Sequence, residues 1–284
     1  MQPYDGDKAA RRTIMGIVNC TPDSFYTGAG RMPSPRALQK QVVSHLLGGA
    51  GIIDIGGCST RPGADEVPLE EEWRRVRRGL RAAETTFRAW GRYPKLSVDT
   101  YRSEVARRAI EEFGVEMIND VSGGLYDAQM YGLVAETGVQ YVAMHMRGTP
   151  KTMMSLTDYE EVVSDVAEAL KERIEAMHAA GIKDRQIVLD PGFGFAKTLE
   201  QEYELLHGLD RLVALGYPVL VGVSRKSMIT RAIHVDKGDA LPATTALHWE
   251  LLRKGADILR VHDVYEARQV VDMYNFYEQT IQQR

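Results

Sequence analysis

Short apolar runs of strand length recur along the whole chain, and most of them end at a polar side chain. The runs lack a strict alternation of apolar and polar residues, as expected for strands that are buried on both faces. Eight such runs predict eight strands of a largely buried sheet. They cover residues 14–19, 52–57, 95–99, 116–120, 141–145, 187–190, 219–224 and 258–262.

Amphipathic stretches of helical period lie between the apolar runs. The clearest covers residues 68–87, where acidic side chains crowd the first turn and arginines follow, as the helix dipole favours. Ser34 followed by Pro35 has the composition of a helix N-cap and first helical position. Glycines that can end a helix in the left-handed conformation stand shortly before six of the runs. They are Gly49, Gly114, Gly138, Gly181, Gly216 and Gly255.

The regular alternation of strand and helix predicts the α/β class with a parallel sheet. Eight strand–helix units predict a (β/α)8 TIM barrel, which we expect to form a single domain over residues 13–284. Residues 1–12 are expected to be a frayed N-terminal extension. A doubly wound open sheet is the structural alternative.

Composition and charge narrow the class of protein. Of the 284 residues, 44% are hydrophobic and 26% are charged, as in soluble globular proteins. The net charge of -4 gives no bulk electrostatic case for binding nucleic acid or an anionic membrane. No apolar stretch approaches the roughly 18 residues of a membrane helix, and the N-terminus lacks the apolar core of a secretory signal. Two cysteines form no disulfide framework, so we expect a reduced, cytoplasmic protein.

Polar side chains and glycines gather where the predicted strands end. Active sites of (β/α)8 barrels lie at the carboxyl ends of the strands, so these residues are expected to share one face of the barrel. An isolated polar residue at a strand end is usually only solvated, but a ring of them indicates a site. The ring consists of Asn19, Gly56, Gly57, Asp99, Asn119, Asp120, His145, Asp190, Ser224, Arg260 and His262.

The stretch VLDPGFGFAKT, residues 188–198, superficially resembles a phosphate-binding P-loop. That motif needs a glycine, four residues and then Gly-Lys-Ser/Thr. Here Ala196 precedes Lys197, and Pro191 stands where the first glycine is required. The spacing therefore excludes a P-loop, and Asp190 becomes the residue of interest.

Eight separate stretches together resemble the dihydropteroate synthase family, from about Thr13 to about Tyr274. They are VNCTPDSF, DIGGCSTRPGA, SVDT, INDVSGG, MHMRGTP, DPGFGFAKT, GVSRKSMI and RVHDV, in order along the chain. The resemblance implies a (β/α)8 barrel, usually a homodimer, and a transferase of folate biosynthesis. Such an enzyme joins 6-hydroxymethyl-7,8-dihydropterin diphosphate to p-aminobenzoate and releases pyrophosphate. Mg2+ accompanies the diphosphate, and sulfonamides compete with p-aminobenzoate.

Two residues depart from the family's pattern. Cys58 stands where many members have glutamate, and Ala196 stands where glycine is common. Neither position carries the chemistry that the resemblance implies. Cys58 puts in doubt a salt bridge near the second loop, and a small buried cysteine is the simplest interpretation of it.

The pterin ring presents two adjacent donors, its 2-amino group and a ring N–H. A carboxylate matches that edge with two parallel hydrogen bonds. By resemblance Asp190 is this carboxylate, and a ring without those donors would leave it buried and unpaired, which is costly. Asp99 is also expected to favour positive charge on the ring, although alone it could merely cap the helix that begins near Arg102. The implied pterin contacts are Asp99, Asn119, Met144, Asp190, Lys226 and Arg260.

The diphosphate site is implied to come from the first, second and eighth strand ends. Asn19 would supply a neutral oxygen to Mg2+, a hard cation that often keeps most of its waters. Arginine can stack on a flat ring and still donate to the leaving group. The implied residues are Asn19, Thr60, Arg61, Arg260 and His262.

The p-aminobenzoate site is implied to lie beside Phe195, whose ring would pack on the substrate ring. Ser227 would meet the carboxylate at a helix N-terminus, which favours anions. Asp23 and Ser24 are expected to form a lid with the second loop. The implied p-aminobenzoate contacts are Thr60, Phe195, Ser224, Lys226 and Ser227, and the implied catalytic residues are Asp99, Arg61, Lys226, Arg260 and His262.

Two other functions fit parts of the pattern. A pterin-binding methyltransferase of the methyltetrahydrofolate type shares the barrel and the pterin-reading acids, but it does not need TPDSF, STRPGA or the lysine of SRKSMI. A non-catalytic pterin-binding paralogue would keep the pocket without turnover, and Cys58 is the only hint of it.

Overall fold

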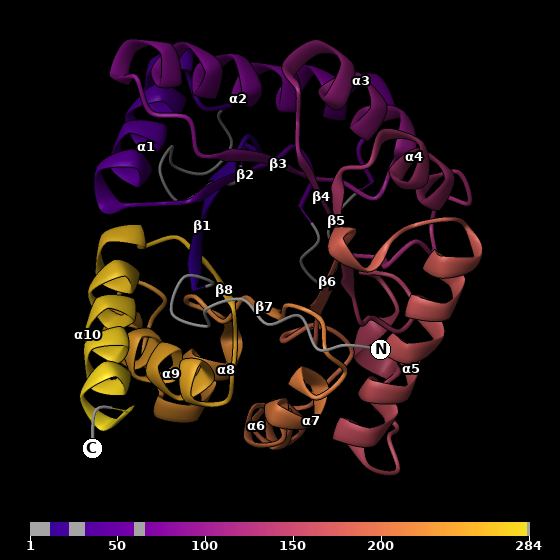
Figure 1. Cartoon of the computed structure of the whole chain (residues 1–284), viewed down its shortest axis with the longest axis vertical. Coiled ribbons are helices and arrows are strands. Elements are labelled where there is room, and N and C mark those ends of the chain that lie inside the picture. Colours follow the sequence, from indigo (N-terminus) through magenta and orange to yellow (C-terminus); the bar gives the residue numbers. More distant parts are fainter. Residues whose placement is uncertain (1–11, 23–31, 60–65, 283–284) are drawn as a thin grey trace.

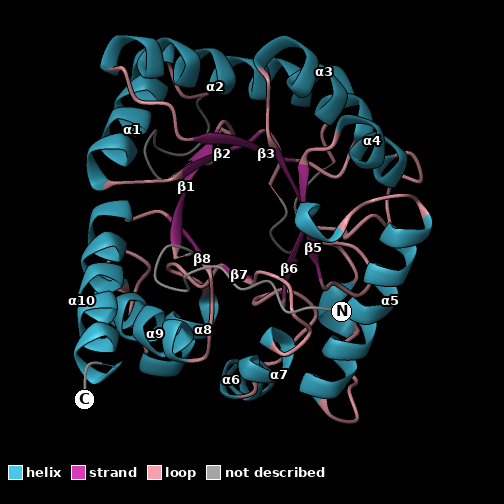
Figure 2. Ribbon diagram, in the orientation of Figure 1, coloured by secondary structure: helices cyan, strands magenta, loops and turns pink. Residues whose placement is uncertain are grey.

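Eight parallel strands form a barrel that helices surround on the outside (Figures 1 and 2). This computed structural model describes residues 12–22, 32–59 and 66–282. The strands lie in the order β6-β5-β4-β3-β2-β1-β8-β7, so chain neighbours are also neighbours in the sheet. This order confirms the predicted (β/α)8 barrel. The strands are β1 (Thr13–Asn19), β2 (Ile52–Gly56), β3 (Lys95–Asp99), β4 (Met117–Asp120), β5 (Gln140–Met144), β6 (Ile187–Asp190), β7 (Leu220–Val221) and β8 (Ile258–Val261).

One or more helices follow each strand and pack against its outer face (Figure 2). Within the described residues no helix is both long enough and apolar enough to span a membrane. Arg12 lies at the edge of the predicted N-terminal extension, and it donates to Asn275 at 2.6 Å. The helices are α1 (Pro35–Gly48), α2 (Leu69–Trp90), α3 (Ser103–Phe113), α4 (Met130–Thr137), α5 (Val162–Ala179), α6 (Leu199–His207), α7 (Leu209–Val213), α8 (Ser227–Ile233), α9 (Leu241–Arg253) and α10 (Val264–Gln282), with short 3-10 turns at Met153–Ser155 and Asp184–Gln186.

The helix boundaries follow the local sequence signals. Ser34 caps α1, since its side-chain oxygen accepts from the backbone N–H of Ala37 at 3.2 Å. The six glycines predicted to end helices all adopt positive φ, between 65° at Gly114 and 97° at Gly255. Glycine reaches this conformation without a steric penalty, which is why the stops could be read from the sequence.

Strand β7 is shorter than predicted, and it completes the ring. The apolar run 219–224 predicted a longer strand, but only Leu220–Val221 form one. The run then turns, because the N–H of Lys226 donates to the carbonyl of Val223 at 3.0 Å. Between β6 and β7 a single parallel bridge, Leu189 to Val219, joins the two edges. The residues after Val221 therefore stay buried, although their backbone has left the sheet.

The helix α2 approaches the barrel wall closely at Gly79. A Cβ placed there would lie 2.5 Å from Cys20 Sγ and 2.5 Å from a methyl carbon of Ile55. Real Cβ atoms do not come this close to other heavy atoms, and the two neighbours are themselves buried in the core. The missing side chain at Gly79 therefore sets how near α2 lies to the sheet.

We predict that Gly79→Ala destabilises the protein by about 1–3 kcal/mol, because it overpacks this contact. Gly132→Ala is the matched control, since Gly132 also lies within a helix but has no atom within 4 Å of its added Cβ. The control should be neutral or stabilising by up to about 1 kcal/mol through helix propensity. Urea unfolding of both variants measures the difference, and equal stabilities would contradict the packing argument.

Candidate active site

The inner surface of the barrel is built in tiers that follow the two-residue repeat of the strands. The floor is an apolar cluster of one side chain from almost every strand. On five of these strands the residue two positions further along is polar or methionine, so that Ile52 is followed by Asp54 and Val188 by Asp190. The floor consists of Met15, Ile52, Met117, Val142, Val188, Leu220 and Ile258.

Asp54 lies at the centre of the polar tier and is fully buried. One of its carboxylate oxygens accepts from Ser97 Oγ at 2.6 Å. The other accepts from Asn119 Nδ2 at 3.0 Å and from Arg260 Nε at 2.8 Å. A buried carboxylate is tolerated only when it is paired and hydrogen-bonded in this way. Asp54 of β2 therefore fixes side chains of three other strands, β3, β4 and β8.

Arg260 is held between two carboxylates. Its Nη2 donates to Asp99 at 2.7 Å, while its Nε donates to Asp54. Burial alone would lower the pKa of Arg260, but Asp54 and Asp99 outweigh burial and raise that pKa well above its ordinary value. Burial raises the pKa of Asp99 to about 7, with Arg260 opposing the rise and Asp54 adding to it. Asp99 therefore forms an ion pair with Arg260 and does not cap α3.

Asp190 ends β6 and faces the cation of Lys226. The backbone N–H of Gly192 donates to Asp190 Oδ1 at 2.8 Å. Burial raises the pKa of Asp190, while Lys226 acts in the opposite direction. Burial lowers the pKa of Lys226 to about 8, against the attraction of Asp190. The predicted pterin-reading acid is therefore buried beside a lysine that remains protonated at neutral pH.

Lys226 acts electrostatically on Asp190 and contacts the loop that carries Phe195. Its ammonium donates to the carbonyl of Phe193 and lies 5.0 Å from the centre of the Phe195 ring. This distance permits a cation–π contact. Ser227, the next predicted residue, is the exposed first residue of α8.

Ser224 and His262 form a polar pair at the ends of β7 and β8. Ser224 Oγ lies 3.1 Å from His262 Nδ1, and it accepts the backbone N–H of His262 at 3.2 Å. Because Ser224 Oγ accepts that N–H, its own hydroxyl proton can be donated to Nδ1, which leaves the ring proton on Nε2. Burial and Arg260 lower the pKa of His262 to about 4, so the ring is neutral at pH 7.

Two further predicted residues complete the described part of the site. Asn19 ends β1, level with Gly56 and Asp99 in the strand register. Its side-chain oxygen lies 3.6 Å from the position that a Cβ on Gly56 would take, so Gly56 leaves room for it. Met144 ends β5 and packs in a small apolar cluster with Met146, Met153 and Ala196.

The predicted residues Thr60 and Arg61, together with Asp23 and Ser24, lie outside the described residues. At the near end of the second loop, Cys58 lies against Glu72 of α2. Glu72 is fully buried and accepts from Thr100 Oγ1 and from Arg102 Nη1, both at 2.6 Å. Burial and Glu72 raise the pKa of Cys58 well above its ordinary value, and burial raises that of Cys20 to about 12. Neither thiol is therefore an activated nucleophile.

A hard oxygen donor for a metal ion lies at the end of β1. Among the residues that the structure describes, no group of three His, Cys, Asp or Glu is arranged to hold a metal ion. The amide oxygen of Asn19 is a hard donor of the kind that Mg2+ accepts alongside water and phosphate oxygens. The donor set therefore fits Mg2+ that arrives with a diphosphate.

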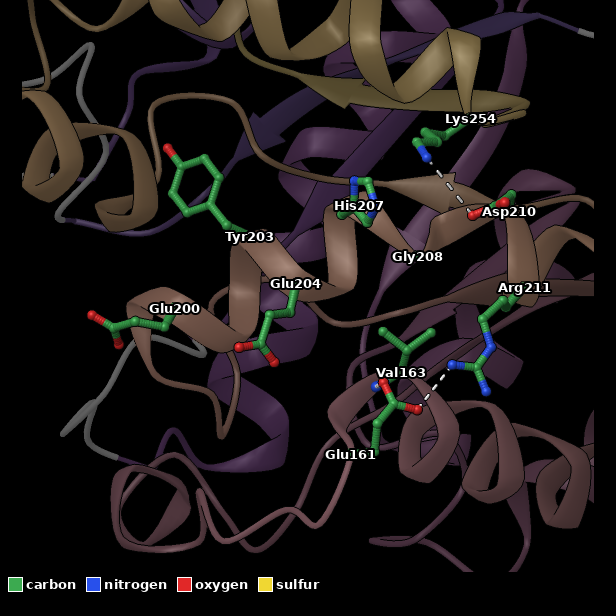
Figure 3. Close-up of a pocket in the computed structure, with 10 residues that line it drawn as sticks. All are labelled: Glu161, Val163, Glu200, Tyr203, Glu204, His207, Gly208, Asp210, Arg211 and Lys254. Atoms are coloured by element: carbon green, nitrogen blue, oxygen red, sulfur yellow. Dashed lines mark hydrogen bonds and ion pairs between the residues drawn. The ribbon is translucent and has the colours of Figure 1, made fainter.

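A cavity of about 630 Å3 lies elsewhere, on the outside of the barrel between α5, α6 and α7 (Figure 3). Glu161 pairs with Arg211 at 2.9 Å there, and Lys254 lies 3.9 Å from Asp210. None of the predicted site residues lines it. Its charged groups face solvent, and this cavity therefore does not mark the candidate active site.

Sequence reasoning missed Asp54. The signal was an acidic residue inside the apolar run IIDIGG, on a strand buried on both faces. Burying a carboxylate is costly without partners, so its presence there predicts a cation on another strand of the barrel. Arg260 is that cation.

Comparison with known proteins agrees with this geometry. A family model described as pterin binding enzyme matches residues 15–262. The dihydropteroate synthase of Synechocystis is 40% identical over 265 residues, which are 93% of this chain and 89% of that protein.

Two solved structures have the same fold. The dihydropteroate synthase of Xanthomonas albilineans with 4-aminobenzoic acid is 38% identical, with a TM-score of 0.85 over 95% of this chain and 94% of that one. The Yersinia pestis enzyme in complex with a sulfonamide drug is 34% identical, with a TM-score of 0.88 over 98% of this chain and 99% of that one. The chain therefore belongs to the pterin-binding enzyme family and, within it, to the dihydropteroate synthases.

Proposed function

We propose that the carboxyl end of this barrel condenses 6-hydroxymethyl-7,8-dihydropterin diphosphate with p-aminobenzoate, giving 7,8-dihydropteroate and pyrophosphate. The observation that carries the proposal is the buried set of Asp54, Asp99, Asn119 and Arg260 beside Asp190 and Lys226, in a chain that belongs to the dihydropteroate synthases. A methyltransferase of the methyltetrahydrofolate type does not require the lysine at position 226. The position of Lys226 between the acid and Phe195 therefore favours the condensation.

In the proposed complex the pterin ring occupies the space above the polar tier. Asp190 accepts the two adjacent donors of the ring edge, while Asn119 and Asp99 meet the other heteroatoms. Met144 and the guanidinium plane of Arg260 supply apolar and stacking surface. Because these groups are held by one another before the ligand arrives, little side-chain ordering remains to oppose binding.

The diphosphate lies toward the first, second and eighth strands in this proposal. Asn19, Thr60, Arg61, Arg260 and His262 surround it, with His262 donating as a neutral imidazole. Mg2+, held by Asn19, would offset the charge of the phosphate oxygens when bound. These donors stabilise the departing pyrophosphate, which takes both electrons of the broken C–O bond.

The arylamine approaches from the side of Phe195, Lys226, Ser224, Ser227 and Thr60. Its nitrogen is unprotonated at neutral pH, so it can attack the pterin methylene carbon without a general base, and the nitrogen then loses one proton to water. The carbon becomes electron-poor as pyrophosphate leaves, and the carboxylate of Asp99 favours the positive charge that spreads into the ring. Arg61 and Lys226 orient the two substrates.

We also propose that two copies of the chain associate. Five large apolar side chains on α10 are exposed, and a second copy would cover them. An adjoining groove between α9 and α10 has a volume of about 520 Å3 and includes Trp249. The exposed residues of α10 are Tyr265, Met273, Phe276, Tyr277 and Ile281.

We further propose that the protein works in the cytoplasm, since its two free cysteines suit a reducing compartment.

We predict that the protein releases pyrophosphate from the pterin diphosphate and Mg2+ only when p-aminobenzoate is present. A sulfonamide should suppress the release competitively, and 7,8-dihydropteroate should appear in equal amount. A coupled pyrophosphate assay measures this. Tight pterin binding by calorimetry without release would instead indicate a non-catalytic paralogue.

We predict a bell-shaped dependence of kcat/KM on pH, with its maximum between about 7 and about 8. Below this window Asp99 gains a proton and no longer favours the ring cation. Above it Lys226 loses its proton, and its positive charge no longer acts on Asp190. Asp99→Asn should remove the acidic limb, at much lower activity, and Lys226→Arg should move the alkaline limb upward. A profile that is flat from about pH 6 to about pH 9 would contradict these roles.

A further inference from the structure

A second lysine lies beneath the loop between β6 and α6, and the proposed reaction does not use it. Lys197 is the residue that made this stretch resemble a P-loop, yet only 3% of it is exposed. A lysine is rarely buried to this degree without specific partners. Its place just before the first residue of α6 puts it under the turn that carries Phe193 and Phe195.

The ammonium of Lys197 meets three acceptors. Its Nζ donates to the carbonyls of Gly192 and Phe195, both at 3.0 Å, and lies 3.1 Å from His145 Nδ1. Burial and the nearby cation of Lys197 lower the pKa of His145 to about 2, so the ring is neutral and Nδ1 accepts. An ammonium has three donors, and this arrangement uses all of them.

The loop above Lys197 has a backbone that needs such support. Gly192 and Gly194 adopt φ of 72° and 83°, and Ala196 adopts a left-handed φ of 48° although it has a side chain. Strained residues of this kind persist only where the surroundings determine the conformation. The N–H of Gly194 also bonds to the buried carboxylate of Glu202 on α6.

We propose that Lys197 is a positioning residue that sets the shape of the arylamine subsite. By holding the carbonyls of Gly192 and Phe195, it presents the carbonyl of Phe193 to Lys226 and keeps the Phe195 ring 5.0 Å from that ammonium. It acts through the loop and does not touch substrate. The proposal rests on the assignment of Phe195 and Lys226 to p-aminobenzoate under the proposed function.

Two carboxylates near Lys197 favour its protonated form against the effect of burial. Burial lowers the pKa of Lys197 to about 7, Asp190 of β6 and Glu202 of α6 act in the opposite direction, and Lys226 and Arg147 add to the lowering. An apolar side chain of similar length would fill the space but leave the Phe195 carbonyl and His145 Nδ1 without the donor that Lys197 supplies. The Gly192 carbonyl would lose the ammonium and keep the N–H of Phe195 at 3.2 Å. Such unsatisfied groups destabilise the conformation that contains them.

The first test measures amide hydrogen exchange in residues 192–196 of the ligand-free protein. Lys197→Met should speed exchange there by about tenfold or more, because the held turn opens locally. Lys171→Met is the matched control, since Lys171 is an exposed lysine of α5 that pairs with Glu168 at 3.0 Å on the outside of the barrel. Unchanged exchange in Lys197→Met would overturn the proposal whatever the protein catalyses.

The second test is a double-mutant cycle between Lys197→Met and Phe195→Ala, read as KM for p-aminobenzoate. Each single change should raise KM by about tenfold, and the double variant should be close to either single variant because both act on one ring. The affinity for the pterin diphosphate should stay within about threefold of wild type. Effects that multiply to about a hundredfold would overturn the route through Phe195.

The two tests separate the failure of this inference from that of the proposed function. Faster exchange with an unchanged KM in Lys197→Met would overturn the positioning role, and an unchanged KM in Phe195→Ala would place p-aminobenzoate away from Phe195. Absence of pyrophosphate release in the wild-type protein would contradict the proposed function, while the exchange result would still decide whether Lys197 holds the loop.

If Lys197→Met does not fold, Lys197→Arg is the second variant, because it keeps the cation. We expect residues 192–196 of this variant to exchange at the wild-type rate, and its KM for p-aminobenzoate to rise less than that of Phe195→Ala. A KM for Lys197→Arg as high as that of Phe195→Ala would overturn the proposal.

Discussion

The site depends on one largely buried guanidinium that two carboxylates hold inside the barrel. Taking Arg260 and Asp54 out of water costs several kcal/mol for each ion, and only close pairing with further hydrogen bonds offsets it. Asp54 meets that demand by accepting from Arg260, Asn119 and Ser97 together. These contacts fix the directions of Arg260, Asn119 and Ser97, so this part of the pocket is shaped by charge balance before any ligand arrives.

The barrel supplies the geometry that this charge balance needs. Strand residues alternate between the inner and outer faces, so the apolar floor at Ile52, Met117 and Ile258 places polar residues two positions later at the open end. Loops then extend the tier outward. Lys226 follows β7 and reaches the loop after β6, which brings residues 36 apart in sequence, Asp190 and Lys226, into one electrostatic unit.

Much of this could be predicted from the sequence, because local rules dominate a parallel barrel. Apolar runs and glycine stops gave all eight strands, and the strand ends gave Asp99, Asn119, Asp190 and Arg260. The strand at 219–224 was predicted too long because a buried turn is as apolar as a buried strand. Asp54 and the buried state of Lys197 were missed, since a single sequence does not show which charges on distant strands become partners.

The affinity of Asp54→Asn for 6-hydroxymethyl-7,8-dihydropterin diphosphate, measured by calorimetry, tests whether the Asp54–Arg260 pair shapes the pterin pocket. We expect a loss of about a hundredfold or more, because breaking a buried ion pair leaves Arg260 without one of its two carboxylate partners. Asp120→Asn is the control, since Asp120 is an equally buried carboxylate on β4 whose partners are Tyr141, Ser122 and Gly124. It should change the affinity by no more than about threefold. Equal losses in the two variants, or an unchanged affinity in Asp54→Asn, would show that the Asp54–Arg260 pair does not shape the pterin pocket.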